Sequence, residues 1–557
     1  MSEGRVRDAG DAALLLELSE VIDPRVNDAA IAAAAGVARD RLPGVRDVLA
    51  TYRTVAVHFD PETAEPGAIG RALARAGATP VPTLPGPLIE VPVSYGGEHG
   101  PDLEEVAAWA GIPAARVAER HARREYRVFM LGFLPGFAYM GSVDPVIAAP
   151  RRSSPRMRVP AGSVGIAGGQ TGVYPIDSPG GWQIVGRTPL HVFDASKAVP
   201  ALFAPGCRVR FVPGDSRAQA FDESQSGIRA GTAPSEADAG ATFVTVLSPG
   251  LHTTIQDEGR WGSQAMGVPV SGAMDLFSHR VANALAGNGR DAATLEMTLT
   301  GPELRMDAAA TIAIAGADLS PTLDGTPLAM NTAVSCKAGS VIGFGERRTG
   351  GRAYVAFAGG IQVPPVLGSR STHVRTRMGG LAGRALRAGD RLPLGAAAGA
   401  IAGLAVQDAS GHIDSEGRTR PQATAVLRVL PGPQDDFFPA SALDVLQGTR
   451  LTVTPQSDRM GYRLTGTRAI PRLPDHEMIS DATCAGAIQV PPSGAPILLM
   501  ADRQTTGGYP QLAVVISADQ PRAGQLVPGD AIEFRICSRR EAREALAAQR
   551  ERLRAVE

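Results

Sequence analysis

Lysine is almost missing from this 557-residue chain: Lys197 and Lys337 are its only lysines, beside a large set of arginines. Neither stands in a G-x-x-x-x-G-K-[ST] or a V-A-I-K context, which excludes a P-loop and an ordinary protein-kinase domain. Any anionic ligand must therefore be held mainly by arginine side chains, backbone N–H groups or helix N-termini.

Long apolar runs, clustered cysteines and an excess of charge of one sign are also missing. No apolar run approaches the ~20 residues that span a bilayer, and the N-terminal segment has no signal-peptide cleavage pattern. The four cysteines, at 207, 336, 484 and 537, are far apart and lack metal-ligand spacing. A net charge of −1 gives no electrostatic footprint for nucleic acid or membrane. We expect a soluble cytoplasmic protein with free thiols and no metal site of its own.

The length predicts several domains, because a single core does not extend over 557 residues. Residues 12–94 alternate strands and helices in the order β-α-β-β-α-β, with 88–96 as the returning strand, which is typical of a ferredoxin-like layer. Gly- and Pro-punctuated short strands then predict a β-barrel or sandwich in each half. We place the boundaries at 1–87 (ferredoxin-like), 88–213 (barrel), 214–240 (linker), 241–537 (barrels) and 538–557 (charged surface helix). The expected class is α+β, mainly β.

Two distant segments resemble each other. Residues 159–175 read VPAGSVGIAGGQTGVYP and residues 490–510 read VPPSGAPILLMADRQTTGGYP. Such an internal echo predicts two related modules with equivalent loops. We expect Gln170–Tyr174 and Gln504–Tyr509 to lie near one shared cleft.

Aromatic and histidine candidates come first along the chain. In GFLPGFAYMG (132–141), a Pro-Gly turn makes a rigid loop whose Phe137 and Tyr139 either wall a pocket or pack a barrel corner. His121, just upstream in a predicted helix, is either a structural residue or the group that transfers a proton.

Arginine-rich and glycine-rich loops supply the remaining candidates. Guanidinium groups suit carboxylate or phosphate, and glycine and proline beside so many polar groups favour functional loops. Local Asp–Arg pairs at 458–459 and 502–503 either stabilise the fold or orient an arginine towards an anion. The candidates in these loops are Arg152, Arg156, Gln170, Thr171, Tyr174, Arg187, Gln256, Asp257, Arg260, Ser271, Asp275, Arg459, Asp502, Arg503, Gln504, Thr505 and Tyr509.

These motifs resemble a bacterial family over nearly the whole chain. Residues 88–195 are similar to the B subunit of 5-oxoprolinase, also known as allophanate hydrolase subunit 1, through GFLPGFAYMG, PRRSSPRMRVPAGSV, QTGVYP and SPGGWQIVGRTP. Residues 244–535 are similar to the C subunit through GLHTTIQDEGRWG, GVPVSGAMD, AGGIQVPPVLGSRST, PQSDRMGYRL and DRQTTGGYP. The chain looks like a fusion of the two subunits.

The resemblance implies cyclophilin-like barrels in both halves and an ATP-dependent step. ATP, with Mg²⁺, would phosphorylate the lactam oxygen of 5-oxoproline, and a separate A subunit would complete ring opening to glutamate. In that chemistry Arg152, Arg156, Arg187, Arg459 and Arg503 would meet the phosphoryl charge. His121 or Asp257 would handle protons.

Two alternatives stay open. The same domains form the carboxyltransferase part of biotin-dependent urea carboxylases, although this chain has no Met-Lys-Met biotin acceptor and so carries no covalent biotin. Related proteins also regulate a sensor histidine kinase. The sequence leaves the exact amide substrate and the oligomeric state open, a homo-oligomer included.

Overall fold

The computed structural model describes residues 4–79, 86–214, 242–397, 424–474 and 478–556. The predicted linker, apart from Gly214, lies outside these ranges. Within them, no helix is long and apolar enough to cross a membrane.

The N-terminal domain is a four-stranded antiparallel sheet in the order β1-β2-β4-β3, covered by two helices. Asp23 starts the first helix by accepting a hydrogen bond from the Arg25 N–H at 2.7 Å. Alanines and valines of that helix pack on leucines and valines of the sheet. The elements are β1 (Arg5–Asp8), β2 (Ala13–Glu17), α1 (Pro24–Asp40), β3 (Val45–Ala50), β4 (Thr54–Phe59) and α2 (Pro66–Ala78).

The expected returning strand at 88–96 does not join this sheet, so that prediction was wrong. β1 forms a hairpin with β2 through Gly10, which has φ +79° and suits a glycine. The hairpin occupies the free edge of β2, so no place beside β2 is left for a later strand. The 88–96 segment instead becomes the first strand of a barrel.

The first barrel closes in the order β10-β7-β6-β13-β5-β12-β9. β5 and β13 run parallel, with Leu88 opposite Arg208. Its strands are β5 (Leu88–Tyr95), β6 (Glu125–Leu131), β7 (Ala138–Gly141), β9 (Ser163–Ala167), β10 (Gln170–Val173), β12 (Gln183–Arg187) and β13 (Arg208–Pro213). Outside it lie α3 (Leu103–Ala110), α4 (Ala114–Ala122), β8 (Arg156–Val159) and β11 (Ser178–Gly180).

The second barrel repeats this topology strand for strand. It closes in the order β25-β32-β29-β30-β27-β26-β33, again with its first and last strands parallel. Its strands are β25 (Ala425–Pro431), β26 (Leu451–Val453), β27 (Gly461–Gly466), β29 (Ala487–Gln489), β30 (Ile497–Leu499), β32 (Gln511–Val515) and β33 (Ala531–Ile536). A two-stranded ribbon, β28 (Asp481–Ala482) with β31 (Thr506–Gly507), matches the β8–β11 ribbon of the first barrel. A closed barrel in each half confirms the predicted fold class.

The shared topology corrects the alignment of the two echoed segments. Gln170 and Thr171 lie in β10, whose counterpart is β30, whereas Gln504 and Thr505 follow β30 and precede β31. The structural counterpart of 506–511 is 178–183, because both segments run from the ribbon to a glutamine that begins the next barrel strand. The modules are duplicated, but the two Gln-Thr segments are not equivalent loops.

Between the barrels in sequence lies a pair of packed sheets rather than a further closed barrel. One sheet has the order β20-β19-β22-β17-β14-β24 and the other β15-β16-β23-β18-β21, with a shared apolar core. Their elements are β14 (Thr242–Ser248), β15 (His252–Gln256), α5 (Leu276–Leu285), β16 (Thr294–Thr298), β17 (Glu303–Met306), β18 (Ala310–Gly316), β19 (Pro321–Leu323), β20 (Thr326–Pro327), β21 (Ala333–Cys336), β22 (Val341–Phe344), β23 (Arg352–Phe357) and β24 (Arg391–Leu394). We refer to this unit as the sandwich.

Short helices complete the second half. α8 begins with a capping box between Ser538 and Glu541, and it buries Leu553 against the α5 cluster. The expected charged surface helix therefore has one packed face. The helices are α6 (Ala442–Gln447), α7 (Gln520–Gly524) and α8 (Arg539–Arg554), with 3₁₀ turns η4 (Gln264–Met266), η5 (Val374–Thr376), η6 (Asp435–Phe437) and η7 (Ser517–Asp519); a further 3₁₀ turn, η1 (Pro145–Ile147), lies in the first barrel.

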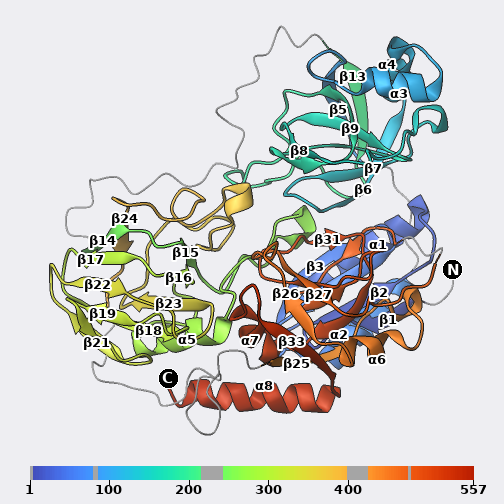
Figure 1. The fold of residues 1–557 in the computed structure, drawn as a ribbon. Helices are drawn as coiled ribbons and strands as arrows, with labels where there is room; N and C mark the ends of the chain where they lie inside the picture. The colour runs from blue at the N-terminus through green and yellow to red at the C-terminus, as the bar shows by residue number, and fades with distance from the viewer. Residues whose placement is uncertain (1–3, 80–85, 215–241, 398–423, 475–477, 557) are drawn as a thin grey trace.

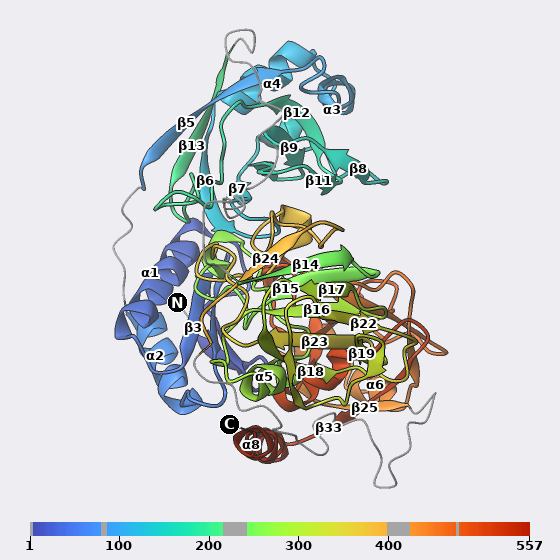
Figure 2. The ribbon, with the colours of Figure 1, turned by 90° about the vertical axis from the view of Figure 1, so that its left-hand side faces the viewer.

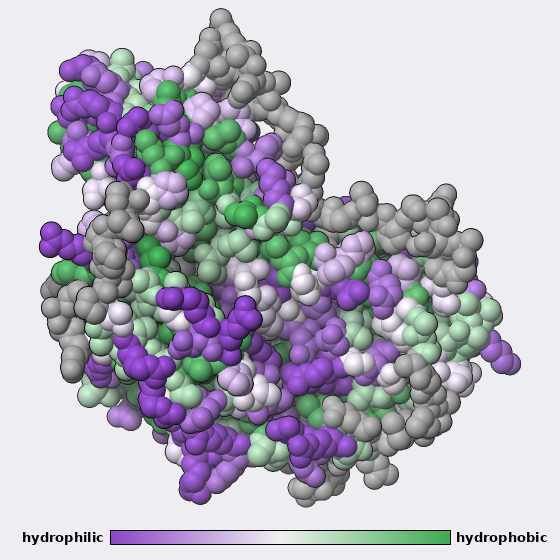
Figure 3. Space-filling view, turned by 180° about the vertical axis from the view of Figure 1, so that it is seen from behind, coloured by the Kyte–Doolittle hydropathy of each residue, from purple (hydrophilic) through white to green (hydrophobic). Residues whose placement is uncertain are grey.

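The first barrel stands as a separate lobe on a body made of the other units (Figures 1 and 2). The N-terminal domain precedes that barrel in sequence but packs on the second half of the chain. Thr51 donates to Asp481 at 3.0 Å, and the Ser517 N–H donates to Asp11 at 3.0 Å. Seen from behind, the lobe end that carries α3 and α4 is largely hydrophilic, and apolar surface gathers where the lobe meets the body (Figure 3).

Candidate functional site

A large cleft lies between the two barrels. Its volume is about 1140 Å³, enough for a nucleotide-sized ligand. From the first barrel it takes aromatic residues and the loop after η1, and from the second barrel the segments around 469–474, 492–494 and 504–509.

The wall from the first barrel is an aromatic cluster built around Phe137. Its ring makes edge-to-face contacts with Tyr139, Tyr174 and Trp182 at centroid distances of 5.0, 5.4 and 5.3 Å. Such contacts fix ring orientations. Burial raises the pKa of Tyr174 to about 12, so its hydroxyl stays protonated at neutral pH and can donate a hydrogen bond.

The charged groups of the cleft are all of one sign. Arg151, Arg152, Arg375 and Arg472 line it, and no aspartate or glutamate is among its described lining residues. Arg152 is held by Asp102 at 3.1 Å and Glu105 at 3.0 Å. Arg375 donates to the Met460 sulfur at 2.9 Å. The cleft therefore presents a positive field beside flat apolar rings, which suits an anion with a planar part.

Direct contacts hold the first barrel against the rest of the chain. The Phe133 N–H donates to the Thr506 hydroxyl of the opposite wall at 3.2 Å, and the Gly136 N–H donates to the Met266 carbonyl in the η4 turn at 2.8 Å. Gly132 packs so closely on Thr506 that a Cβ added there would lie 2.8 Å from the Thr506 Cγ2. The glycine-rich loop of the first barrel is thus fitted to the loop 502–507.

Six of the candidate residues from the sequence meet in this cleft: Phe137, Tyr139, Arg152, Tyr174, Gln504 and Tyr509. Tyr174 comes from the first echoed segment and Gln504 and Tyr509 from the second, whereas the other three precede the first segment. Sequence reasoning did not select Arg151, Trp182, Arg375 or Arg472. Arg151 and Trp182 lie in loops that the sequence analysis had selected. Arg375 and Arg472 are isolated arginines in the sequence, and only the fold brings them to the cleft.

His121 lies inside the first barrel instead. It is fully buried, its Nδ1 is 2.7 Å from the Tyr95 hydroxyl, and its Nε2 is 2.8 Å from the Thr171 hydroxyl. Its ring stacks on Phe211 at 4.6 Å. Burial lowers the His121 pKa to about 3, so the ring is neutral. With both nitrogens engaged in the core, His121 and Thr171 have a structural role, contrary to the prediction.

Asp257 organises a loop of the sandwich. It accepts hydrogen bonds from the hydroxyls of Ser369 at 2.7 Å and Ser371 at 2.5 Å and from the Arg370 N–H at 2.6 Å. Arg260 donates to the Val366 and Ser371 carbonyls at 2.8 and 2.7 Å. Asp257 and two of the three Arg260 nitrogens are occupied within the loop, and neither residue lines the cleft, so the geometry does not support the proton-handling role expected of Asp257 or the binding role of Arg260.

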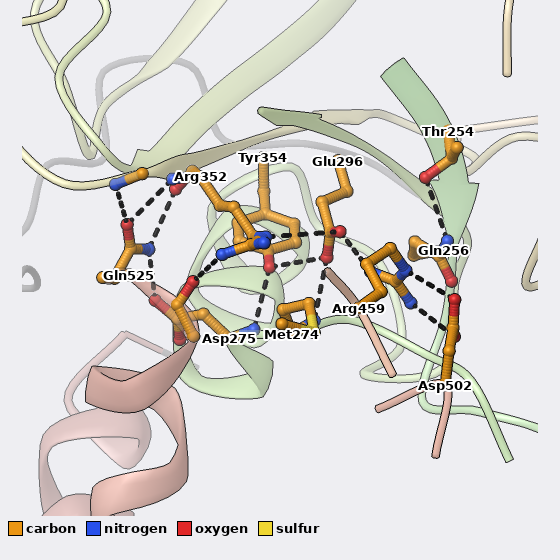
Figure 4. A network of polar contacts seen from close by, with 12 residues as sticks. Thr254, Gln256, Met274, Asp275, Glu296, Arg352, Tyr354, Arg459, Asp502 and Gln525 are labelled. Carbon is orange, nitrogen blue, oxygen red and sulfur yellow. Dashed lines mark hydrogen bonds and ion pairs between the residues drawn. The ribbon is translucent and has the colours of Figure 1, made fainter. Parts of the chain in front are cut away.

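Arg459 and Asp502 belong to a buried ion network between the sandwich and the second barrel (Figure 4). Arg459 contacts Asp502 at 3.0 and 3.1 Å and is also paired with Glu296. Tyr354 donates to Glu296 at 2.8 Å. These buried ion pairs give Arg459 and Asp502 a role in holding the sandwich and the second barrel together. Neither residue is among the described lining residues of the cleft.

The other candidates are also held by protein groups. Asp275 caps α5 and accepts from Gln525 at 2.7 Å, and Gln256 donates to the Thr372 carbonyl at 3.1 Å. Arg156 forms a two-pronged pair with Asp102 at 2.8 and 2.5 Å, and Gln170 donates to the Tyr52 hydroxyl at 2.6 Å.

The four remaining candidates also lie outside the cleft. Arg187 donates to the Ala161 carbonyl at 2.8 Å, and Thr505 is buried beside the cleft loop. Ser271, together with Arg503, lines a separate, smaller cavity.

The described residues contain no group of three His, Cys, Asp or Glu side chains that could hold a metal ion. The four cysteines are buried and unbridged.

Comparison with protein-family models assigns both halves of the chain to the carboxyltransferase domains. The family model for carboxyltransferase subdomains C and D matches residues 4–203, and the model for subdomains A and B matches residues 266–536. The chain is 38% identical over 225 residues to the 5-oxoprolinase B subunit of Bacillus subtilis, covering 37% of this chain and 92% of that protein. It is 36% identical over 303 residues to the 5-oxoprolinase C subunit of Escherichia coli, covering 54% of this chain and 94% of that protein. The chain belongs to this family and fuses a B-like part to a C-like part.

Solved structures agree with that arrangement. The crystal structure of TTHA0988 matches with a TM-score of 0.80 and 34% identity, covering 95% of this chain and all of that one. Among relatives matched by sequence, the urea amidolyase of Lachancea kluyveri is 33% identical over 321 residues, covering 55% of this chain but 17% of that protein. The fused two-barrel architecture is therefore shared by another protein over its full length.

Proposed function

We propose that this protein is the ATP-dependent component of a 5-oxoprolinase. The observation that carries the proposal is the inter-barrel cleft, where four arginines and an aromatic wall face a space with no described carboxylate. The similarity of the two halves to the B and C subunits of 5-oxoprolinase supports it.

The proposed reaction is phosphorylation of a cyclic amide. The lactam oxygen of 5-oxo-L-proline attacks the γ-phosphorus of ATP, and the bond from that phosphorus to the ADP oxygen breaks. The phosphorylated lactam then has an electrophilic carbon and a good leaving group, and its hydrolysis to glutamate is completed by a separate A subunit. ATP would bring Mg²⁺ on its phosphates.

The cleft residues have defined tasks in this proposal. Arg151, Arg375 and Arg472 would neutralise the transferring phosphoryl group and the carboxylate of the substrate. Arg152, braced by Asp102, would add a positioned charge. The rings around Phe137 would hold the planar part of a ligand and exclude water.

The test is ADP release by the intact protein mixed with a homologue of the A subunit of 5-oxoprolinase. We expect ATP hydrolysis that depends on 5-oxo-L-proline and yields glutamate in equal amount. ATP hydrolysis that ignores 5-oxo-L-proline would contradict the proposal.

A second candidate is carboxyl transfer to urea or another amide, favoured by the carboxyltransferase family models and the similarity to urea amidolyase. It would need a biotin carrier and a biotin carboxylase on other chains. Carboxylation of urea with those components, without lactam-dependent ATP hydrolysis, would select it. In either case the buried free thiols fit a reducing cytoplasm.

A further inference from the structure

A second cavity lies where the N-terminal domain, the sandwich and the second barrel meet. Its volume is about 150 Å³, the size that accommodates a six-membered carbon ring. Apolar side chains such as Phe277, Leu499 and Val514 form much of its wall, and α8 covers it with Leu546. We refer to it as the junction cavity.

Most charged side chains around the junction cavity form ion pairs with oppositely charged side chains of the protein. Arg46 pairs with Asp60 at 2.7 Å. Arg280 pairs with Glu62 at 3.1 Å and with Glu258 at 2.6 Å. These groups therefore leave little net charge in the cavity.

Asp11 also lines the cavity, and it is satisfied by Ser517. It accepts hydrogen bonds from the Ser517 N–H at 3.0 Å and from the Ser517 hydroxyl at 2.9 Å.

Arg503 is the exception. It is 3% exposed, and it has no ion pair within 4 Å among the described residues. Its Nε has no described hydrogen-bond partner, and a terminal nitrogen donates to the neutral Gln264 amide at a long 3.4 Å. Asp47 attracts Arg503 electrostatically but makes no direct ion pair with it, and the two are joined through Gln264, which donates to Asp47 at 3.1 Å. A buried guanidinium with no directly paired carboxylate is costly.

His58 lines the same cavity from the N-terminal domain. It is 4% exposed, and its Nε2 also has no described partner. Burial, followed by the positive charge of Arg503, lowers the His58 pKa to about 3. Both side chains line the junction cavity, so two groups that each have a ring or guanidinium nitrogen without a described partner border one largely apolar space.

We propose that the junction cavity binds a small monocarboxylate whose carboxylate pairs with Arg503 and hydrogen-bonds to His58, with a ring-sized apolar part against the surrounding side chains. The site is distinct from the inter-barrel cleft, although Arg503 and Gln504 are neighbours in one loop and face the two spaces. His58 belongs to the B-like part and Arg503 to the C-like part. The ligand therefore bridges the two parts and stabilises their contact.

Cyclopentanecarboxylate is a suitable probe because it has a ring-sized apolar part and one carboxylate but no lactam, and the Arg151→Gln variant distinguishes its binding in the cavity from binding to the cleft arginines. Its uncharged isostere, cyclopentanecarboxamide, is the matched ligand control. Titration calorimetry on the full chain should give one carboxylate per chain and at least tenfold weaker binding of the carboxamide. Equal binding of the two probes would overturn the proposal.

Variants assign the site. Arg503→Gln should weaken carboxylate binding at least tenfold, Arg503→Lys should weaken it less, and Arg151→Gln in the cleft should leave it unchanged. Unchanged binding by Arg503→Gln, or loss in Arg151→Gln, would refute the assignment. Without ligand, Arg503→Gln should melt no lower than the parent, because an unpaired charge is removed; a clear fall in Tm would indicate a structural arginine instead.

Crystals of the parent protein soaked in the probe provide a measurement that needs no variant. We expect density for the ring carboxylate between Arg503 and His58. Density confined to the cleft, ordered water alone in the cavity, or an adventitious additive only would each contradict the proposal.

Discussion

Replacing Arg459 with methionine should strongly destabilise the second half of the chain. Arg459 is 8% exposed and makes two contacts with Asp502, at 3.0 and 3.1 Å, besides its pair with Glu296. Methionine leaves the Asp502 charge buried without its partner. Removing one member of a buried ion pair costs about 3–5 kcal/mol, and the larger value is expected here because two carboxylates share the arginine.

The pH dependence of this loss has a defined sign. Burial alone would raise the pKa of Asp502, but the Arg459 charge outweighs it and holds the pKa below its usual value. The stabilisation is therefore present above the unfolded-state pKa near 3.8 and is lost as the pH falls through the folded-state value. The stability gap between the parent and Arg459→Met should narrow in acid.

Urea unfolding followed by circular dichroism at pH 7 and at pH 3, below the unfolded-state pKa, measures both effects. Several domains unfold in this chain, so midpoints are compared transition by transition. Arg540→Met is the matched control: its side chain is 82% exposed and pairs with Glu544, so a change below about 0.5 kcal/mol is expected. An Arg459→Met protein as stable as the parent but unable to bind ligand would refute the structural assignment of Arg459.

Two further predictions concern the first barrel. His121 has a pKa near 3 against 6.5 for the free side chain, so its contribution to stability is lost as the pH falls below 6.5. At pH 5 the loss is about 2 kcal/mol, and His121→Leu should remove this part of the acid sensitivity in melts at pH 5 and 7; an unchanged profile would show that His121 is not the group involved. Gly132→Ala pushes a methyl group onto Thr506 and should reduce activity by separating the barrels, whereas Gly169→Ala, with open space around it, should not. Equal activity of these two variants would contradict the close fit of the barrel walls.

The sequence predicted the modules better than their connections. Turn spacing and β-branched content identified barrel-forming segments, because these are local signals. The sheet position of the 88–96 strand was predicted wrongly, because the edge of β2 is occupied by β1, and this pairing is not visible in the local pattern of either segment. The sequence also did not show that Gln170–Thr171 lie in a barrel strand while Gln504–Thr505 lie in a loop, because similarity between two short segments does not fix which residues pair in a strand.

The candidate site was predictable in part for the same reason. Aromatic and arginine loops indicated an anion site, and Tyr174 and Tyr509 do line one cleft. Sequence could not show that Arg459 is neutralised by Glu296, 163 residues away. Only long-range packing separates an arginine that faces a ligand from one that holds two domains together.

Binding of ATP·Mg²⁺ measured by titration calorimetry tests the central claim most directly. The double variant Arg151→Gln/Arg375→Gln removes two charges from the cleft, and Arg540→Gln/Arg554→Gln removes two exposed charges from α8. If the inter-barrel cleft is the nucleotide site, the first variant binds at least tenfold more weakly than the parent at an unchanged Tm, and the second binds as the parent does. Equal affinity of the parent and the Arg151→Gln/Arg375→Gln protein would contradict the account.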